Sequence, residues 1–313
     1  MFKKLKYYFQ RRTPQTYKPV ILVTGCSTGI GAATARMLYE CEEYRVVVTS
    51  RRHSLSRLRD KFAENERFWA RPLDITSARE REELIHEISE KWGGVDILVN
   101  NAGISYRAVV EHMTEEDELL QITTNYLGPV ALIRLVLPHM REQGRGKIIN
   151  ISSVSGMLAM PTMASYSASK YALEGMSEAL WYEAKPFGIN VCLIQPGFIR
   201  SNSFRNVYYS KLSDPKVNRT TVYKDYYVNM APFVGRLMRM SVTRPKHVAR
   251  IVLKVIRTEN PPLWIPATLD AWAFYYLRRI VPRRWLMPLL FALLPRAKTW
   301  GSKFTNRREV QKK

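Results

Sequence analysis

The order of hydrophobic and polar positions along the chain predicts an α/β fold built on a parallel sheet. From about residue 19, short β-branched runs alternate with longer amphipathic stretches, which is the pattern of βαβ units. Nearly continuous apolar runs indicate strands that are covered on both faces. Such runs stand at Val20–Val23, Arg45–Ser50, Asp96–Asn100, Lys147–Ile151 and Asn190–Ile194. We therefore expect a doubly wound parallel sheet with helices on both faces.

The longer amphipathic stretches predict the helices that connect these strands. They cover Ala32–Tyr39, Ser77–Trp92, Glu115–Met140 and Ala164–Lys185. Pro129 falls inside the third stretch. Because proline has no amide proton and restricts the residue before it, Pro129 should bend that helix or end its first part.

The pattern changes after the segment Gln195-Pro196-Gly197. Here aromatic and methionine side chains stand among polar ones, which predicts a substrate lid over about residues 201–243. The apolar side chains in question are Phe204, Tyr208, Tyr209, Tyr223, Tyr226, Tyr227, Met230, Phe233 and Met238. An alternative is that these aromatic side chains form core or a dimer contact. If they line a pocket, it is predominantly apolar and suits a lipid-like substrate.

The last third of the chain predicts the end of one domain and an appended segment. A helix from Pro245 to Arg257 and a short strand at Leu263–Ile265 complete a catalytic domain of residues 19–267. Residues 268–313 are by turns aromatic, apolar and basic, so we expect a C-terminal extension with an amphipathic and basic character.

Positive charge is concentrated at the two ends of the chain. Of the net charge of +22, residues 1–18 carry +6, residues 243–313 carry +13, and residues 19–242 carry +3. A basic N-terminal arm and a basic extension around a nearly neutral domain are typical of attachment to an anionic membrane surface or to a polyanion. Solubilising charge is the alternative. We do not expect nucleic acid to be the partner.

Cysteine and histidine usage predicts neither a disulfide framework nor a metal site. Three cysteines and five histidines show no paired ligand spacing, which favours a reducing compartment. The basic N-terminus leads into no apolar segment of a secretory signal. The apolar stretch Trp285–Leu294 is interrupted by Pro288 and is shorter than the roughly 20 residues that a spanning helix needs. These features predict a cytoplasmic protein that can lie on a membrane.

A glycine-rich turn follows the first predicted strand and opens the first helix. Glycines let the backbone approach a pyrophosphate, which the helix N-terminus then stabilises. A glycine turn alone can be purely structural, but this strand and helix context predicts dinucleotide binding on a Rossmann-type domain. The expected cofactor contacts are Gly25, Ser27, Thr28, Gly29, Ile30 and Gly31.

The end of the second predicted strand indicates which dinucleotide binds. The sequence Thr49-Ser50-Arg51-Arg52 has no acidic residue of the kind that accepts hydrogen bonds from the ribose of NAD. Arginine forks suit a 2′-phosphate. Ser50, Arg51 and Arg52 therefore predict NADP(H), with solvated surface arginines as the alternative.

Tyr166 and Lys170 stand four residues apart in a predicted helix, which places them on one face. A nearby ammonium lowers a phenol pKa and allows proton exchange with a substrate oxygen. The pair alone is common on protein surfaces. Ser153 stands thirteen positions upstream of Tyr166, at the end of a predicted strand. Its presence favours a catalytic role for the pair.

These motifs, taken in order, resemble the short-chain dehydrogenase/reductase family over roughly residues 19–267. The resemblance is carried by the glycine turn, Asn100-Asn101-Ala102-Gly103, Asn125 within Asn-Tyr-Leu-Gly, Ile151-Ser152-Ser153, Tyr166-Ser-Ala-Ser-Lys170 and Pro196-Gly197. The extension resembles, more loosely, that of hydroxysteroid and retinol dehydrogenases. The resemblance implies an NADP(H)-dependent oxidoreductase that interconverts an alcohol and a ketone or aldehyde.

The resemblance also implies roles for the matching residues. Tyr166 would be the general acid/base, Lys170 would tune it and hold the nicotinamide ribose, and Ser153 would polarise the carbonyl. Asn125 would fix a water that links Lys170 to solvent. Cofactor contacts would come from Asp74 at the adenine, from Asn101, Ala102 and Gly103, and from Pro196, Gly197, Ile199 and Ser201 near the carboxamide. Ser201 stands where the family often has threonine.

Two other functional hypotheses remain open at this point. The first is a non-catalytic NADP(H)-binding sensor that signals through its basic ends. The complete set of catalytic residues argues against it, because a sensor does not need Tyr166 and Lys170 together. The second is a nucleic-acid-binding protein, which would show a steep salt dependence of its affinity. A homodimer is compatible with the sequence.

Overall fold

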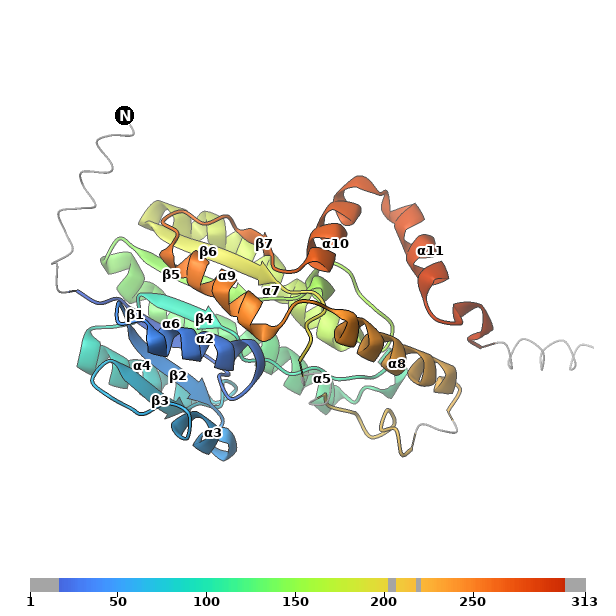
Figure 1. The fold of residues 1–313 in the computed structure, drawn as a ribbon, viewed down its shortest axis with the longest axis horizontal. Helices are drawn as coiled ribbons and strands as arrows, with labels where there is room; N and C mark the ends of the chain where they lie inside the picture. The colour runs from blue at the N-terminus through green and yellow to red at the C-terminus, as the bar shows by residue number, and fades with distance from the viewer. Residues whose placement is uncertain (1–16, 202–206, 218–220, 302–313) are drawn as a thin grey trace, which may run out of the picture.

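The computed structural model describes residues 17–201, 207–217 and 221–301, and these form a doubly wound α/β domain with a C-terminal extension (Figure 1). The sheet has seven strands, all parallel, in the order β3-β2-β1-β4-β5-β6-β7. The strands are β1 Val20–Val23, β2 Arg45–Ser50, β3 Phe68–Pro72, β4 Ile97–Asn100, β5 Gly146–Ile151, β6 Ile189–Gln195 and β7 Trp264–Pro266. The predicted fold class is confirmed.

Helices cover both faces of this sheet (Figure 1). The main helices are α2 Gly29–Glu40, α3 Ser56–Arg59, α4 Ala78–Trp92, α5 Glu115–Ile122, α6 Gly128–Glu142, α7 Ala164–Ala184, α8 Lys224–Met240, α9 Pro245–Arg257, α10 Leu269–Ile280 and α11 Arg283–Leu293. Buried side chains of α2 and α9 pack on one face of the sheet, and those of α4, α6 and α7 pack on the other.

Strand β3 was not among the predicted strands. It lies at the edge of the sheet and pairs with β2 alone. Arg71 and Pro72 interrupt its apolar run, and a proline is tolerated here because an edge strand has an unpaired side. A short edge strand therefore lacks the continuous apolar signal that identified the central strands.

The predicted helix at Glu115–Met140 consists of three consecutive elements. Helix α5 ends at Ile122, a π-helical turn covers Thr123–Leu127, and α6 then begins at Gly128 with Pro129 in its first turn. The first helical part thus ends before the proline, as expected. Asn125 lies in the π-helical turn, a type of irregularity that is frequent at functional sites.

This composite helix, Glu115–Glu142, is the one helix within the described residues that is long and apolar enough to cross a membrane. Half of its most apolar window is buried in the domain. Its buried side chains, among them Leu132, Val136 and Met140, pack in the sheet core. The helix therefore has the surroundings of a core helix.

The segment predicted as a lid contains residues 207–217 and helix α8. Tyr227, Met230 and Val234 of α8 are buried, so part of the aromatic pattern does form core. Phe204 lies outside the described residues, as do residues 1–16 of the basic arm and 302–313 of the extension. The movement of a lid over the site stays a prediction.

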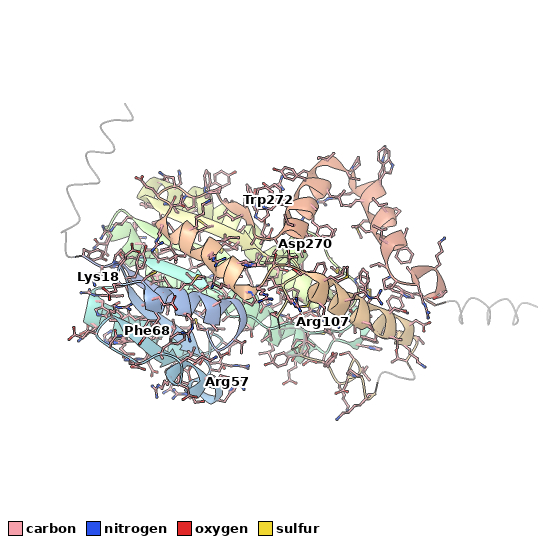
Figure 2. The ribbon with its side chains drawn as sticks, in the orientation of Figure 1. Lys18, Arg57, Phe68, Arg107, Asp270 and Trp272 are labelled. Atoms are coloured by element: carbon pink, nitrogen blue, oxygen red, sulfur yellow. The ribbon has the colours of Figure 1, made fainter. Side chains whose placement is uncertain are left out.

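The extension begins directly beside the loop that follows β6. Thr268 Oγ1 accepts a hydrogen bond from Gly197 N at 2.9 Å, and Asp270 Oδ2 accepts one from Phe198 N at 2.7 Å. Figure 2 shows Asp270 and Trp272 at the start of α10. The first turn of α10 is thus bonded to the domain, and two of its side chains hold a loop of the site described below.

Lys147 joins β5 to the end of α9. Its ammonium donates hydrogen bonds to the carbonyl oxygens of Val255 (2.9 Å), Ile256 (2.8 Å) and Thr258 (2.6 Å). Burial lowers the pKa of Lys147. A cation at this position satisfies carbonyl groups that have no partner within the helix and complements the helix dipole.

We expect Lys147→Met to lower the free energy of unfolding by about 1–3 kcal/mol, because it leaves partly buried carbonyl groups without their donor. Chemical denaturation measures the change. The exposed Lys91→Met on α4 is the matched control and should change stability far less. Equal stability of the two variants would show that the Lys147 hydrogen bonds contribute nothing net.

Candidate functional site

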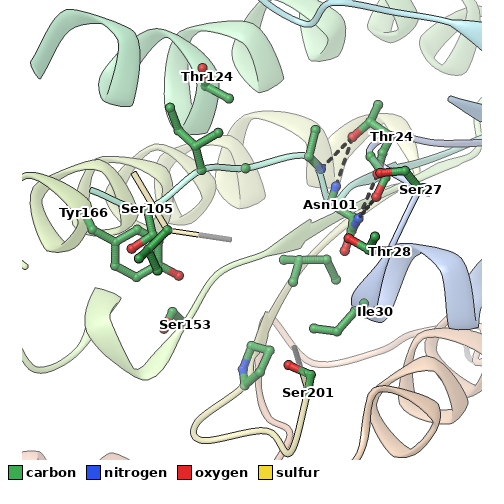
Figure 3. A pocket seen from close by; sticks show the side chains of 18 of the residues that line it. Thr24, Ser27, Thr28, Ile30, Asn101, Ser105, Thr124, Ser153, Tyr166 and Ser201 are labelled. Carbon is green, nitrogen blue, oxygen red and sulfur yellow. Dashed lines mark hydrogen bonds between the residues drawn. The ribbon is translucent and has the colours of Figure 1, made fainter. Parts of the chain in front are cut away.

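A cavity of about 740 Å³ lies at the carboxyl ends of the central strands (Figure 3). It is lined by residues that follow β1, β2, β4, β5 and β6 and by the catalytic face of α7. β1 and β4 are neighbours although β1 is followed in sequence by β2, so the chain changes direction across the sheet at this point. Ligands of open α/β sheets bind at such switch points.

The glycine turn after β1 has the backbone that its sequence predicts. Gly25 and Gly29 have positive φ angles of 70° and 63°, which residues other than glycine rarely adopt. A Cβ on Gly25 would lie 2.7 Å from Ala102 Cα. A Cβ on Gly31 would lie 2.4 Å from both Asn101 Nδ2 and Gly25 O. Gly31 therefore permits close packing of α2 and is not among the described residues that line the cavity, whereas Gly25 and Gly29 line it.

Asn101 ties the loop after β4 to this turn. Its Nδ2 donates to Thr24 O at 2.8 Å and to Gly25 O at 3.0 Å. In return, Thr24 Oγ1 accepts from the backbone N of Asn101 at 3.1 Å and of Ala102 at 3.0 Å (Figure 3). Asn101, Ala102 and Gly103 all line the cavity. The asparagine thus fixes the two backbone segments that line this end of the cavity.

The two arginines after β2 differ in their surroundings. Arg51 lines the cavity, and its Nη2 donates to Tyr208 Oη at 3.1 Å. Arg52 pairs with Glu80 at 3.4 Å, is 69% exposed, and is not among the cavity residues. Arg57 of α3, which sequence reasoning did not select, lines the cavity together with Ser50. No motif marks Arg57, because its position depends on how α3 folds back.

Asp74 lies at the same end of the cavity, as its predicted contact with an adenine requires. Its Oδ1 accepts hydrogen bonds from Thr76 N at 2.9 Å and from Thr76 Oγ1 at 2.7 Å. These contacts orient the carboxylate. The adenine contact itself stays a prediction.

The predicted catalytic residues Ser153, Tyr166 and Lys170 all line the cavity. Ser153 follows β5, and Tyr166 and Lys170 lie one turn apart on α7. The Lys170 Nζ is 5.9 Å from the centre of the Tyr166 ring. Figure 3 shows Ser153, Tyr166 and Ser105 at one end of the cavity, with Ser27 and Thr28 at the other. The structure therefore brings Ser153, Tyr166 and Lys170 together at the end of the cavity that lies away from the glycine turn and helix α2.

The pKa of Tyr166 is raised, and burial is the main cause. A hydrogen bond with Ser153 and the positive charge of Arg107 act in the opposite direction. Sequence reasoning expected an ammonium at Lys170 to lower this pKa, and that expectation is not met in the structure. The physical reason is that desolvation of the phenolate outweighs the nearby charges, and the cation that opposes it is Arg107.

Lys170 itself is buried, which lowers its pKa to about 8, while the charge of Glu174 one turn later acts in the opposite direction. Its Nζ donates to Ile151 O at 2.9 Å. Glu174 is anchored in turn, since it accepts hydrogen bonds from Ser152 Oγ at 2.6 Å and from Gln195 Nε2 at 3.0 Å. The hydrogen bond to Ile151 O thus fixes the Lys170 side chain of α7 against the end of β5.

Arg107 is a cavity residue that the sequence analysis missed. It lies between β4 and the one-turn helix Val110–His112, in a loop without a recognisable motif. Burial lowers its pKa, and the charges of Tyr166 and Tyr209 act in the opposite direction. Only the folded loop brings this cation near the phenol, so the sequence carries no local signal for it.

Asn125 is not among the described residues that line the cavity. Its Oδ1 accepts from Ile104 N at 2.8 Å, and its Nδ2 donates to Ile104 O at 2.9 Å and to Ser169 Oγ at 3.0 Å. Ser169 lies next to Lys170 on α7. The asparagine side chain therefore joins the loop after β4 to the catalytic helix, and its predicted role in holding a water stays a prediction.

The loop after β6 closes the cavity near Ser153. Pro196, Gly197, Ile199 and Ser201 all line it. Pro196 O accepts from Val154 N at 2.8 Å. Together with the hydrogen bonds that Gly197 N and Phe198 N donate to Thr268 and Asp270, this contact fixes the backbone that is expected to face a carboxamide.

The described residues contain no cluster of three or more His, Cys, Asp or Glu side chains that could hold a metal ion. Cys26 and Cys192 are buried, and all three cysteines are free thiols.

Comparison with known proteins agrees with this geometry. A family model described as short chain dehydrogenase matches residues 19–211. A 3-ketodihydrosphingosine reductase from Bacteroides thetaiotaomicron is 35% identical over 245 residues, which are 78% of this chain and 85% of that protein. Dehydrogenase/reductase SDR family member 7 from Mus musculus is 32% identical over 267 residues, 82% of this chain and 74% of that protein.

Solved structures share the fold. A short-chain dehydrogenase from Streptomyces avermitilis superposes with a TM-score of 0.70 at 30% identity, covering 94% of this chain and 99% of that one. The structure of ElxO with NADP bound gives a TM-score of 0.66 at 25% identity, covering 82% of this chain and 100% of that one. With a family model that spans more than half of its length, this chain belongs to the short-chain dehydrogenase family and is an oxidoreductase.

Proposed function

We propose that the protein uses NADP(H) to interconvert an alcohol and a ketone or aldehyde of an apolar, lipid-like compound. The observation that carries this proposal is the convergence of Ser153, Tyr166 and Lys170 on one cavity with a glycine turn at its other end. A phenol and a hydroxyl that share a hydrogen bond are suited to hold one substrate oxygen.

The residues around the glycine turn fit a dinucleotide. Gly25 and Gly29 leave the backbone open to a pyrophosphate, and Ser27 and Thr28 add hydroxyl groups beside the N-terminus of α2. Asp74 would contact the adenine, and Asn101, which is bonded to the glycine turn, would line the cofactor beside it. When bound, NADP(H) supplies or accepts the hydride.

The preference for NADP(H) over NAD(H) is supported by the cations at the end of β2. Ser50, Arg51 and Arg57 surround one part of the cavity and offer donors for a 2′-phosphate. Arg52, which also entered the sequence-based prediction, is engaged by Glu80. We assign the main phosphate contact to Arg51, with Arg57 beside it.

The protein residues would then act on the substrate oxygen. Ser153 donates a hydrogen bond to it, and Tyr166 gives its proton during reduction or takes one during oxidation. Burial keeps Tyr166 protonated, which suits an acid in the reducing direction. The positive charge of Arg107 and the hydrogen bond with Ser153 stabilise the phenolate that remains after proton transfer.

The walls near Tyr166 support an apolar substrate. They include Met160, Met163, Phe198, Val234 and Met238. One relative is named as a reductase of 3-ketodihydrosphingosine, a lipid ketone, which agrees with this character. A non-catalytic sensor remains the alternative, and it has no need of a proton donor at Tyr166.

The test of this proposal is the reduction of hydrophobic ketones by NADPH in the wild type and in Tyr166→Phe. We expect the substitution to lower kcat/KM by about 100-fold to 10,000-fold, because it removes the proton donor, while NADPH binding stays close to that of the wild type. Tyr182→Phe, on the exposed side of the same helix, is the matched control. A sensor predicts NADPH binding without turnover, and full activity of Tyr166→Phe would refute the mechanism.

The cofactor assignment is tested by comparing Arg51→Ala with Arg52→Ala. A charge-assisted hydrogen bond of about 1.5–3 kcal/mol corresponds to roughly a 10-fold to 150-fold increase in the Kd of NADPH, so we expect a change of that size for Arg51→Ala. Arg52→Ala should change the Kd much less, and neither should change NADH binding strongly. The measurement is a fluorescence titration with both cofactors. Equal effects on NADH and NADPH would exclude a phosphate contact.

A further inference from the structure

Helices α10 and α11 form an arch that projects from the domain (Figure 1). Helix α10 exposes Leu269 (78%), Trp272 (45%), Tyr276 (52%) and Ile280 (76%), whose spacing places them on one side of the helix. Helix α11 exposes Trp285, Met287, Leu289, Phe291 and Leu293 to between 48% and 66%. We call these nine side chains the extension face. Apolar surface of this extent on a protein indicates an interaction site.

The other side of α10 is occupied by the domain. Ala271 is buried in a cluster with Val154 and Met157, against which Phe274 and Tyr275 also pack. Arg278 donates to Met157 O and lies over the Tyr171 ring at 5.1 Å. The extension face of α10 is therefore the side that the domain leaves uncovered.

The arch is attached to the rest of the protein at both of its ends. At its start, Thr268 and Asp270 hold the loop after β6. At its end, the Trp300 ring lies 4.5 Å from the Tyr226 ring of α8 and 6.2 Å from the Phe291 ring of α11. The arch that carries the extension face is thus connected to the loop after β6 at one end and to the segment predicted as a lid at the other.

The charge of the arch indicates which kind of partner binds the extension face. Residues 271–300 contain six arginine or lysine side chains and no acidic one. Arg279, Arg283 and Arg284 are exposed, and Arg284 lies over the Trp285 ring at 5.0 Å. Arginine beside tryptophan and aliphatic side chains is typical of helices that lie in the headgroup region of an anionic bilayer.

A second copy of this chain is a poorer match. A symmetric dimer pairs the same surface with itself, so the cations of one arch would face those of the other without an acidic partner from residues 271–300. A spanning helix is also excluded for this segment. The 11 residues of α11 extend about 16 Å, against a hydrocarbon thickness of about 30 Å.

We propose that the extension face docks on the surface of an anionic lipid bilayer, with its apolar side chains in the headgroup and acyl boundary and its arginines at the phosphates. The docking stands on the exposed residues and their charge, independently of the catalytic cycle. Its consequence, that the cavity receives its substrate from the bilayer, rests on the proposed function.

The experiment is flotation of the full-length protein with vesicles of phosphatidylcholine alone or mixed with phosphatidylserine. We expect binding to the mixed vesicles that weakens as salt is added, because the contact between arginines and headgroups is screened. The triple variant Trp285→Ser, Leu289→Ser and Phe291→Ser should reduce the bound fraction by about tenfold or more, since the buried apolar area carries the contact.

Three exposed apolar side chains elsewhere provide the matched control, Val110→Ser, Leu119→Ser and Tyr182→Ser. This control should bind vesicles as the wild type does. Wild-type-like binding by the extension variant would overturn the proposal and would assign the contact to the basic N-terminal arm. A wild-type dimer that the extension variant dissociates, without vesicle binding by either, would also overturn it and indicate a second copy as the occupant.

NADPH oxidation with the hydrophobic ketones of the first test is measured in parallel, without vesicles, on both triple variants. Neither variant changes a residue of the cavity, so the rate should stay near that of the wild type. A protein that binds vesicles but turns over no ketone would contradict the proposed function and leave the docking intact. Turnover without vesicle binding would contradict the docking alone.

Discussion

The site depends on one geometric constraint, the parallel direction of all seven strands. Parallel strands bring their carboxyl ends to the same edge, so residues far apart in sequence meet there without long loops. The glycine turn, Asn101, Ser153 and Pro196 are each a continuation of a central strand. Helix α7 begins near this edge and adds Tyr166 and Lys170. A slip of one residue in the register between β4, β5 and β6 would displace Asn101, Ser153 and Pro196 relative to one another.

A second constraint is the cost of burying charge at this edge. Burial raises the pKa of Tyr166 and lowers those of Lys170 and Arg107, so each group is pushed toward its neutral form. The hydrogen bond with Ser153 and the charge of Arg107 oppose this tendency at Tyr166, and the charge of Glu174 opposes it at Lys170. A tyrosine kept in its protonated form in this way is suited to donating a proton to a substrate oxygen.

The sequence was sufficient for the fold class and for most strands of the core, because those strands are buried on both faces and their apolar runs are continuous. It was insufficient at β3, whose edge position allows polar residues and a proline. Among the site residues, those with a motif were found, and Arg57, Arg107 and Asp270 were not. These three side chains reach the cavity or its loop through tertiary folding, and no local spacing records that. For the same reason, the sequence could not show that Arg51 lines the cavity while Arg52 does not. It also could not show that desolvation raises the pKa of Tyr166 in spite of a nearby cation.

Tyr166 lines the cavity as a partly buried, protonated phenol, and its acidity is set by desolvation against the charge of Arg107. The most direct measurement is an NMR titration of the protein labelled with ¹³C at the tyrosine Cζ, with Tyr166→Phe to assign the signal. We expect a Tyr166 pKa above the ordinary tyrosine value, and a still higher one in Arg107→Met. A Tyr166 that ionises below the ordinary value in the cofactor-free protein, or that does not respond to Arg107→Met, would contradict it.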